Sequence, residues 1–426
     1  MRIGRRLGIA SLAGLGVLLA LAGLVAWLNL LGESRLGPAP PRVAAGAELV
    51  ARGEALTRAG DCISCHTARG GPAYAGGRAI ETPFGNVYAS NLTPDPETGL
   101  GRWSADEFWR ALHHGRSKSG RLLYPAFPYP NYTRVSRADA DAMFAYLQSL
   151  PAVVQPNREH NLGFPFGTQA ALAVWRALYF RPAVHVDDPA RSAEWNRGAY
   201  LVEGLGHCNA CHSARNALGA TRGTLDLQGG LIPVQNWYAP SLASPHEASV
   251  AAWPKQEVIQ LLKTGIAPQG FVMGPMSEVV LNSTQHLSDV DLAAMATYLQ
   301  ALPPPEGDAP PPAVPLASAR GATLYRDHCV ACHGERGEGV PGAYPALAKS
   351  RAVTLRSPAN LVHIVLEGGF PPSTAGNPRP YGMPPFAPVL QDADVAELLS
   401  FLRASWGNRA APVSALDVAR ARAGRD

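Results

Sequence analysis

The pattern of apolar and polar positions divides this chain into an apolar N-terminal segment and a body that repeats three times. Residues 7–32 carry no charge over 26 positions, and only Ser11 and Asn29 have polar side chains. A hydrocarbon core needs about 20 apolar residues, whereas the apolar part of a cleavable signal usually has about 7–15. The pattern therefore predicts a transmembrane helix within residues 1–36 that is retained as a signal anchor.

Positive charge precedes this segment at Arg2, Arg5 and Arg6. Because basic residues beside a membrane helix stay on the cytoplasmic side, the body is expected on the opposite side. A cleaved secretory signal is the alternative. No clear small-x-small cleavage site follows directly, and the nearest candidate region, residues 43–47, lies beyond a Pro-rich stretch.

Each repeat of the body shows three helical patterns. An Arg-Gly dipeptide opens the first helix, at 9 to 11 residues before a cysteine pair. A middle helix starts at a Ser or Trp-Pro signal and stops at a glycine, and a closing amphipathic helix carries an aromatic residue near its end. The closing helices are expected at 136–150, 288–302 and 392–405. A small residue in the first helix and an aromatic in the last would let these two helices cross closely.

Self-similarity of this kind predicts tandem copies of one domain. We expect a mainly α fold, with three tandem domains after the N-terminal helix, at residues 44–152, 190–303 and 317–408. A connecting segment, 153–189, contains an aromatic-rich helix candidate at 170–180. A Pro-rich linker at 304–316 is expected to be stiff, and residues 409–426 are expected to form a polar tail.

Composition supports several small, loop-rich domains plus a membrane segment. Hydrophobic residues make up 46% of the 426 positions and charged residues 16%, with 43 glycines and 39 prolines. This excludes a disordered acidic or basic protein. The net charge of +4 is scattered without a basic run, so no nucleic-acid partner is expected.

The chemistry of the chain lies in its six cysteines, which form three Cys-x-x-Cys-His motifs. Two thiols one helical turn apart can each add to a vinyl group of one haem, and the following imidazole then coordinates the iron, which is the c-type attachment signature. A zinc half-site or a redox pair is the alternative for a single motif. Zinc knuckles pair two motifs within a few tens of residues, whereas these start 146 and 121 residues apart. We therefore predict three covalently bound haem c groups, attached at Cys62/Cys65, Cys208/Cys211 and Cys329/Cys332, with His66, His212 and His333 as iron ligands.

The sixth iron ligand must come from elsewhere, and methionine suits an electron-transfer haem because its thioether raises the potential. Met383 lies 50 residues after its motif histidine and Met276 lies 64 after its own, each ahead of a closing helix. Met273 is the competing choice in the second repeat. Met143 and Met295 fall within closing helices, where we expect them to pack.

The first repeat departs from this pattern. Phe127 stands where Met276 and Met383 stand in the other repeats, and phenylalanine does not ligate iron. His113 and His114, at the end of the middle helix, are nitrogen donors in the same region. Our hypothesis is that the first haem is five-coordinate or bound by an unexpected ligand such as one of these histidines.

The sequence resembles the triheme cytochrome c subunits of membrane-bound bacterial dehydrogenases. These serve quinoprotein alcohol dehydrogenase, the flavin-dependent gluconate, sorbitol and fructose dehydrogenases, and molybdenum-containing aldehyde or N-heterocycle oxidoreductases. The resemblance covers nearly everything after residue 44 and is specific to the subunit type rather than to the partner. It is carried by the three motifs and by segments 91–95, 123–126, 194–202, 207–212, 237–240 and 274–276.

The resemblance implies haem attachment by the six cysteines, proximal ligation by the motif histidines, and distal ligation by Met276 and Met383. It also implies a bacterial inner membrane location with the body in the periplasm, and electron delivery to ubiquinone or a terminal oxidase. Quinoprotein-type members have methionine where Phe127 stands. The form Pro-Ala-Phe-Pro-Tyr at 125–129 is more like the subunits that accompany molybdenum hydroxylases.

The chain lacks a flavin or nucleotide fingerprint and a defensible hydrolase triad. We therefore expect it not to be catalytic alone, but to carry electrons for a catalytic subunit of the molybdenum, flavin or PQQ type. Two alternatives remain open at this point. One is a peroxidase-like enzyme with an open position on the first haem, and the other is a free-standing membrane electron shuttle.

Overall fold

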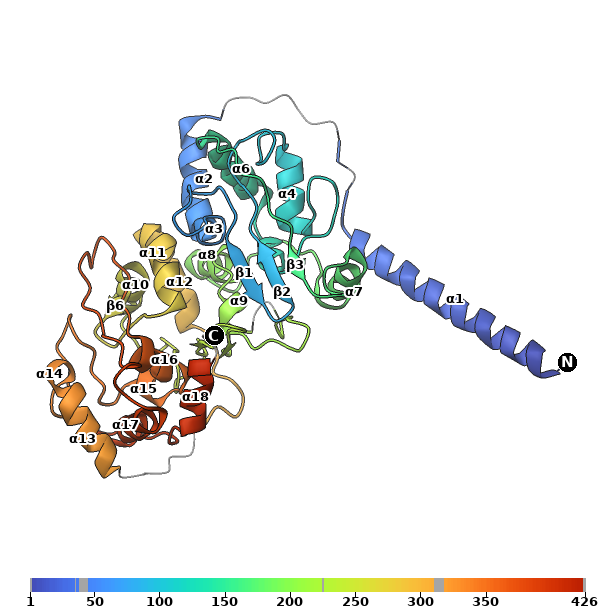
Figure 1. The fold of residues 1–426 in the computed structure, drawn as a ribbon. Helices are drawn as coiled ribbons and strands as arrows, with labels where there is room; N and C mark the ends of the chain where they lie inside the picture. The colour runs from blue at the N-terminus through green and yellow to red at the C-terminus, as the bar shows by residue number, and fades with distance from the viewer. Residues whose placement is uncertain (1, 35, 38–44, 224–225, 310–317, 424–426) are drawn as a thin grey trace.

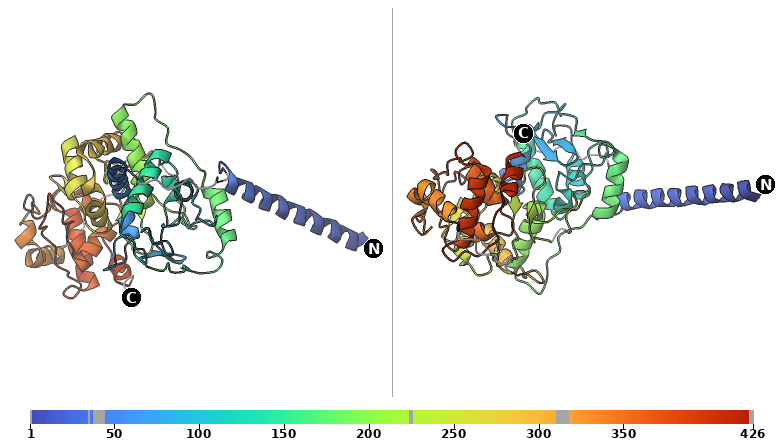
Figure 2. Two further views of the ribbon diagram at one scale, coloured as in Figure 1. Left: turned by 90° about the horizontal axis from the view of Figure 1, so that it is seen from above. Right: turned by 60° about the horizontal axis from the view of Figure 1, so that its bottom comes forward.

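A long helix projects from a mainly helical body in the computed structural model, which describes residues 2–34, 36–37, 45–223, 226–309 and 318–423 (Figure 1). Helix α1 spans Arg2–Leu30, and its stretch Ala10–Leu30 has the length and apolarity of a membrane span, with a mean hydropathy of 2.2. Only the C-terminal end of α1 meets the body, and both further views show the rest standing clear of it (Figure 2). The helix expected within residues 1–36 is therefore present.

The body repeats one arrangement, in which a first helix packs against a closing helix and a short motif helix follows the first. The first unit contains α2 (Ala47–Ala59), α3 (Cys62–Cys65), β1 (Ala79–Thr82), β2 (Gly85–Tyr88), α4 (Ala105–His114), α5 (Tyr129–Tyr132) and α6 (Arg137–Ser149). The connection contains β3 (Asn161–Leu162) and α7 (Gln169–Tyr179). The second unit contains α8 (Ala193–Ala199), the π-helical turn η1 (Tyr200–Leu205), α9 (Asn209–His212), β4 (Gly230–Leu231), β5 (Tyr238–Ala239), α10 (Lys255–Thr264), β6 (Ile266–Ala267), β7 (Gly270–Phe271), α11 (Pro275–Asn282), the 3-10 turn η2 (Thr284–His286) and α12 (Asp289–Gln300). The third contains α13 (Ala319–His328), α14 (Val330–His333), α15 (Arg351–Thr354), α16 (Ala359–Glu367), α17 (Asp392–Ala404) and α18 (Ala415–Ala423).

In each unit, the first helix crosses the closing helix at the glycine of the Arg-Gly dipeptide. A Cβ atom added at the glycine would lie only 1.9 to 2.3 Å from a backbone oxygen of the closing helix, and within 2.9 Å of the Cβ of that helix's aromatic residue. The expected close crossing is therefore confirmed in all three pairs, because only glycine fits between the helices. The contacts are Gly53 to Ala142, Gly198 to Ala294 and Gly321 to Glu397.

The middle helices end where their stop signals lie. Ser104 caps α4 by accepting a hydrogen bond from Glu107 N, and the Glu107 side chain accepts one from Ser104 N. The helices α4, α10 and α16 are followed by glycines with φ of 56°, 79° and 65°, a region that disfavours side chains. The start and stop signals of the sequence are thus confirmed.

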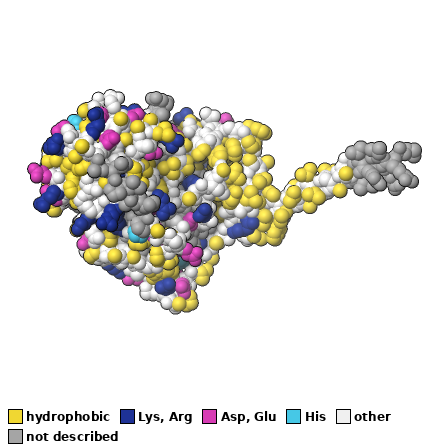
Figure 3. All heavy atoms as spheres, turned by 90° about the horizontal axis from the view of Figure 1, so that it is seen from below, with side chains coloured by type: hydrophobic (Ala, Val, Ile, Leu, Met, Phe, Trp, Pro, Cys, Tyr) yellow, Lys and Arg dark blue, Asp and Glu magenta, His cyan; other side chains and the backbone are white. Residues whose placement is uncertain are grey.

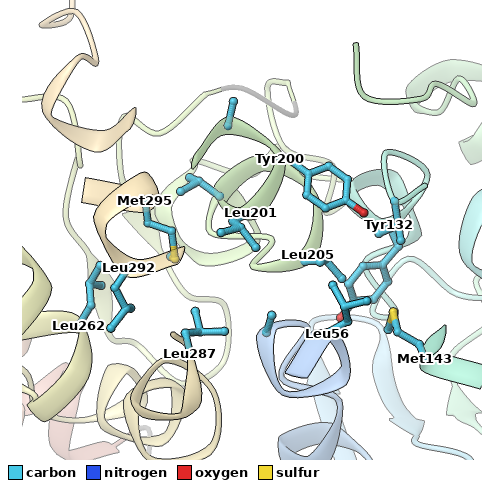
Figure 4. Close-up of a cluster of buried hydrophobic side chains, with 14 of the residues drawn as sticks. Leu56, Tyr132, Met143, Tyr200, Leu201, Leu205, Leu262, Leu287, Leu292 and Met295 are labelled. Carbon is cyan, nitrogen blue, oxygen red and sulfur yellow. The ribbon is translucent and has the colours of Figure 1, made fainter. Parts of the chain in front are cut away.

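Two hydrophobic cores organise the described residues. The first is continuous across the first and second units, so that Leu56 and Met143 belong to the same cluster as Leu201 and Met295 (Figure 4). Met143 and Met295 are 1% and 4% exposed, which confirms their expected packing role. The third unit has a core of its own. The first two units therefore form one body rather than two separately packed domains.

The segment after residue 408 differs from the expected polar tail. Helix α18 packs on α16 and α17, and its Val418 side chain is fully buried. Arg422 also pairs with Asp392 at the start of α17, at 2.7 Å. Although this segment is polar in composition, one face of it is apolar and packs into the third core.

Short antiparallel strands pair within the loops of the first two units and the connection. The connection contributes β3, which pairs antiparallel with β2 at the register Gly85–Leu162, and β2 pairs in turn with β1. Two smaller ladders, β4 with β5 and β6 with β7, lie in the second unit. The connection is thereby attached to the first unit, and it ends in α7, which packs against α1.

Candidate haem sites

Each cysteine pair begins or enters a one-turn helix that directly follows a first helix, so its two sulfur atoms lie one turn apart. The motif histidine then makes the same contact in all three units. Its Nδ1 atom donates a hydrogen bond to a backbone carbonyl, because a carbonyl oxygen only accepts. The pairs are His66 to Ser90 at 2.6 Å, His212 to Pro240 at 2.7 Å and His333 to Pro345 at 3.0 Å.

This contact selects one imidazole tautomer. With the proton on Nδ1, the Nε2 lone pair of each ring is available to a metal, and the carbonyl fixes the plane of the ring. Burial lowers the pKa of His66, His212 and His333, although the carbonyl bond opposes this, so the rings are held neutral. A neutral, oriented imidazole beside two thiols fits the requirements of covalent haem c.

The cysteine thiols do not resemble a redox pair or a zinc site. Burial, the largest cause, raises the pKa of the Cys62 and Cys208 thiols to about 12 and that of the Cys329 thiol to about 11. Redox-active pairs instead have lowered thiol pKa values. Within the part of the chain that the structure describes, no group of three or more His, Cys, Asp or Glu side chains is placed to hold a metal ion. The donor set therefore favours thioether attachment.

Sequence reasoning did not find the carbonyl partners, because a backbone oxygen has no side-chain signature. A weak signal exists in hindsight, since each carbonyl residue is followed two positions later by a leucine. These leucines, Leu92, Leu242 and Leu347, pack against the two cores and so hold the loop that presents the carbonyl.

The candidate distal methionines occupy different local structures. Met276 lies in the first turn of α11, whereas Met383 is paired through its backbone with Gly369, with N–O distances of 2.8 and 2.9 Å. The side chain of Met273 is directed elsewhere, because its Cε atom lies 3.2 Å from the position of a Cβ on Gly369 in the third unit. This contact with another unit favours Met276 over Met273 as the thioether available to the second site.

Phe127 holds the same place in the first unit as Met276 in the second. Leu123 N donates to the carbonyl of the stop glycine Gly115, and Val272 N donates to that of Gly265. Each candidate follows its donor by four residues. Met383 does not share this register, since it is itself in the pair with Gly369.

Phe127 lies close to the first Cys-x-x-Cys-His motif, to which Tyr132 connects it. Its ring lies 5.4 Å from that of Tyr132, whose hydroxyl donates to Gly60 O at 2.7 Å, two residues before Cys62. His113 donates from Nδ1 to Thr133 O and stacks on Trp109, and burial lowers the pKa of the His114 imidazole to about 4.

The first and second motifs lie against each other. The ring of Tyr132 meets that of His207, directly before Cys208, at 5.5 Å. Helix α11 touches α3, where Asn282 Nδ2 donates to Ser64 Oγ at 2.9 Å, inside the first Cys-x-x-Cys. Glu278, also on α11, pairs with Arg78 of the first unit. The helix that carries Met276 is thus attached to the first motif.

The second and third units meet through a different set of contacts. Tyr238 and Asn360 exchange two hydrogen bonds of 2.8 Å, and the ring of Trp237 stacks on that of His363 at 5.0 Å. The third motif helix, α14, lies at the end of the molecule farthest from α1 (Figures 1 and 2).

Comparisons with known proteins identify the family of the chain. A family model described as cytochrome c matches residues 50–151 and 318–406. The chain is 37% identical to the cytochrome c subunit of the quinone alcohol dehydrogenase of Komagataeibacter europaeus, over 92% of this chain and 88% of that protein. It is 39% identical to the gluconate 2-dehydrogenase cytochrome c subunit of Pantoea cypripedii, over 88% and 89%. It is also 40% identical to one of the subunits of nicotinate dehydrogenase from Pseudomonas putida, over 85% of this chain and 31% of that longer protein. The chain therefore belongs to the family of cytochrome c subunits that accompany dehydrogenases such as the alcohol and gluconate enzymes, and it is a haem electron-transfer subunit.

Proposed function

We propose that this chain carries three covalently attached haem c groups and relays electrons from a catalytic dehydrogenase subunit to ubiquinone or a terminal oxidase. The observation that carries the proposal is the threefold recurrence of one site, in which two cysteines and a neutral histidine with a bonded Nδ1 follow a glycine-crossed helix. Bound haem would supply reversible one-electron chemistry, and the protein would set its potential through ligand, burial and nearby charge.

The proposed site residues are those that the sequence motifs and the repeated geometry support. Cys62, Cys65, Cys208, Cys211, Cys329 and Cys332 would hold the haems, and His66, His212 and His333 would provide the proximal nitrogen. Met276 and Met383 are the proposed distal ligands of the second and third sites. Phe127 offers no donor at the first site, which we propose to be five-coordinate or to have a different ligand.

The proposed relay is supported by how closely the units dock. Residues of the first motif contact α11 and His207 of the second unit, and the second and third units share paired hydrogen bonds. Such contacts keep the sites at constant separations, which a relay requires. Three tandem cytochrome c domains are thus proposed over 44–152, 190–303 and 317–408, with the first two sharing a core.

We propose that α1 anchors the chain in the bacterial inner membrane with the body in the periplasm, on the basis of its apolar span and the preceding arginines. The catalytic partner would be of the molybdenum, flavin or PQQ type. The form of the segment around Phe127 favours the molybdenum type, as the resemblance implies.

The haem count is tested by intact mass of the purified full chain together with the pyridine haemochrome absorbance per chain. We expect three haem additions, and one fewer in a variant with both cysteines of a single motif replaced by alanine. Two additions in the parent protein, unchanged in one of the three variants, would contradict the proposal at that motif.

A second candidate function rests on Phe127. If the first iron has an open position, the reduced chain should bind carbon monoxide at one haem, and Phe127→Met should abolish that binding. Peroxidase activity that is lost in the same variant would favour an enzyme, whereas carbon monoxide binding without such activity favours the relay.

A further inference from the structure

The connection helix α7 presents an apolar face to the outside of the body. Val174 and Leu178, one turn apart, are 49% and 61% exposed, and Tyr179 beside them is 39% exposed. The one charged residue of the helix, Arg176, points the other way and is 3% exposed. A surface helix normally turns its polar face outward, and one that is apolar on its outer face needs a cover.

The end of α1 is built into the body beside this helix. Asn29 Nδ2 donates to Ala173 O of α7 at 2.9 Å, and Arg176 Nε donates to Asn29 Oδ1 at 2.9 Å. Arg116 of the first unit donates to Asn29 O and forms an ion pair with Glu33 at 2.6 Å, with both side chains mostly buried. These polar contacts hold α7 at one level along α1.

The α7 contacts lie at the C-terminal end of the apolar span of α1. At about 1.5 Å per residue, the 21 residues of Ala10–Leu30 extend roughly 31 Å, which matches a hydrocarbon core of about 30 Å. Asn29 therefore lies at the membrane boundary, and α7, bonded to it, lies there too. Trp27 is exposed near the same end, and Trp and Tyr are the residues favoured at this boundary. Hydrophobic side chains also gather where α1 leaves the body (Figure 3).

We propose that α7 is a second membrane contact, lying on the bilayer surface with Val174, Leu178 and Tyr179 in the boundary between headgroups and acyl chains. The proposal rests on the anchoring role of α1 proposed above. Lipid is the occupant because the apolar face is continuous with a helix that lipid surrounds, so that lipid reaches it without any further partner. Two contacts on one unit, one spanning and one lying flat, would fix the orientation of the first unit against the membrane.

The test uses the holoprotein, as the full chain, in phospholipid nanodiscs without any partner subunit. Single cysteines carrying a nitroxide label are placed at Leu178 on α7, at Leu18 in the span and at Val290, which is 76% exposed on α12 away from α1. Collisions with oxygen and with a water-soluble nickel complex are then measured by electron paramagnetic resonance. We expect the labels at 18 and 178 to be protected from nickel and open to oxygen, and the label at 290 to show the reverse.

The outcomes separate the two proposals. Protection at 18 with nickel access at 178 equal to that at 290 would overturn the role of α7 and leave the anchor intact, whereas access at all three positions would overturn the anchor itself. A further variant, Val174→Asp with Leu178→Asp, carries its label at Ala170 on the same face and should lose the nickel protection seen at Ala170 without these changes. Unchanged protection would show that the apolar face is not the cause, and an unchanged haem content verifies folding.

Discussion

Replacing Gly53 with alanine tests the helix crossing on which the haem sites are built. The added methyl carbon would lie 1.9 Å from Ala142 O and 2.9 Å from Tyr146 Cβ. An ordinary contact needs about 3.5 Å, so α2 and α6 would have to separate by roughly 1.5 Å. Overpacking of this kind costs about 1–3 kcal/mol or more. Alanine also favours helix by about 1 kcal/mol relative to glycine.

Because the clash is with backbone atoms of Ala142, the upper part of the overpacking range, about 2–3 kcal/mol, applies, and the net expectation is a loss of about 1–2 kcal/mol in the free energy of unfolding. Because the first and second units share one core, they should unfold together as a body of some 150–250 residues, for which each kcal/mol shifts the midpoint by about 2–4 °C. Differential scanning calorimetry of the holoprotein should show this transition lowered by about 2–8 °C.

Two matched variants sharpen the assay. Gly46→Ala adds a methyl at a position with no atom within 4 Å, at the N-cap of α2, and should cost about 0.5 kcal/mol, because alanine is a poorer N-cap than glycine. Gly321→Ala makes the equivalent clash in the third unit and should lower only the transition of the separate third core. A Gly53→Ala midpoint equal to that of Gly46→Ala would refute the reasoning, as would a Gly321→Ala effect on both transitions.

Three further predictions follow from individual contacts. Met276→Ala should remove one methionine-to-ferric-haem charge-transfer band from the visible spectrum while Met273→Ala retains all of them, and the opposite result would assign the second site to Met273. Glu203→Gln should destabilise the shared core by about 3 kcal/mol in urea titrations, because the Glu203 carboxylate pairs with Arg134 across the first two units and accepts from Tyr298 at 2.6 Å. Arg134→Met should then cost less in the Glu203→Gln background than in the parent protein, and equal costs in both backgrounds would contradict coupling between the two side chains. Burial raises the pKa of Asp61 from 3.8 to about 7, and the hydrogen bond from Ser64 opposes this shift. The folded state therefore binds the proton more tightly than the unfolded chain does. The contribution of Asp61 to stability is then present below about pH 4 and is lost as the pH rises through about 7. Asp61→Asn should therefore gain stability relative to the parent as pH rises from 5 to 8, and an equal difference at both pH values would contradict the burial argument.

Much of the molecule is encoded locally, and the sequence alone was enough to find it. Capping residues such as Ser104, stop glycines such as Gly115, and the periodicity of the closing helices act within a few residues, so the helices lie where those signals predict. The haem motifs are likewise local, because two thiols and an imidazole one turn apart need no distant partner to be recognised. The repeated glycine and aromatic positions even predicted the close helix crossing.

Features that depend on residues far apart in the chain were decided only by the tertiary structure. Leu56 and Leu201 belong to one core although they lie in different units. The segment that contains Val418 has the composition of a polar tail, yet it forms a helix whose Val418 side chain is buried in the third core. In both cases burial depends on which residues pack nearby, not on local composition. The carbonyl that orients each motif histidine is a backbone atom 12 to 28 residues away, and the leucine two positions after it is only a weak sequence signal. The orientation of the Met273 side chain depends on its contact with Gly369 of the third unit. The position of α7 along α1 depends on the hydrogen bond from Asn29 to Ala173. Both contacts join residues far apart in the chain, which the order of residues alone does not reveal.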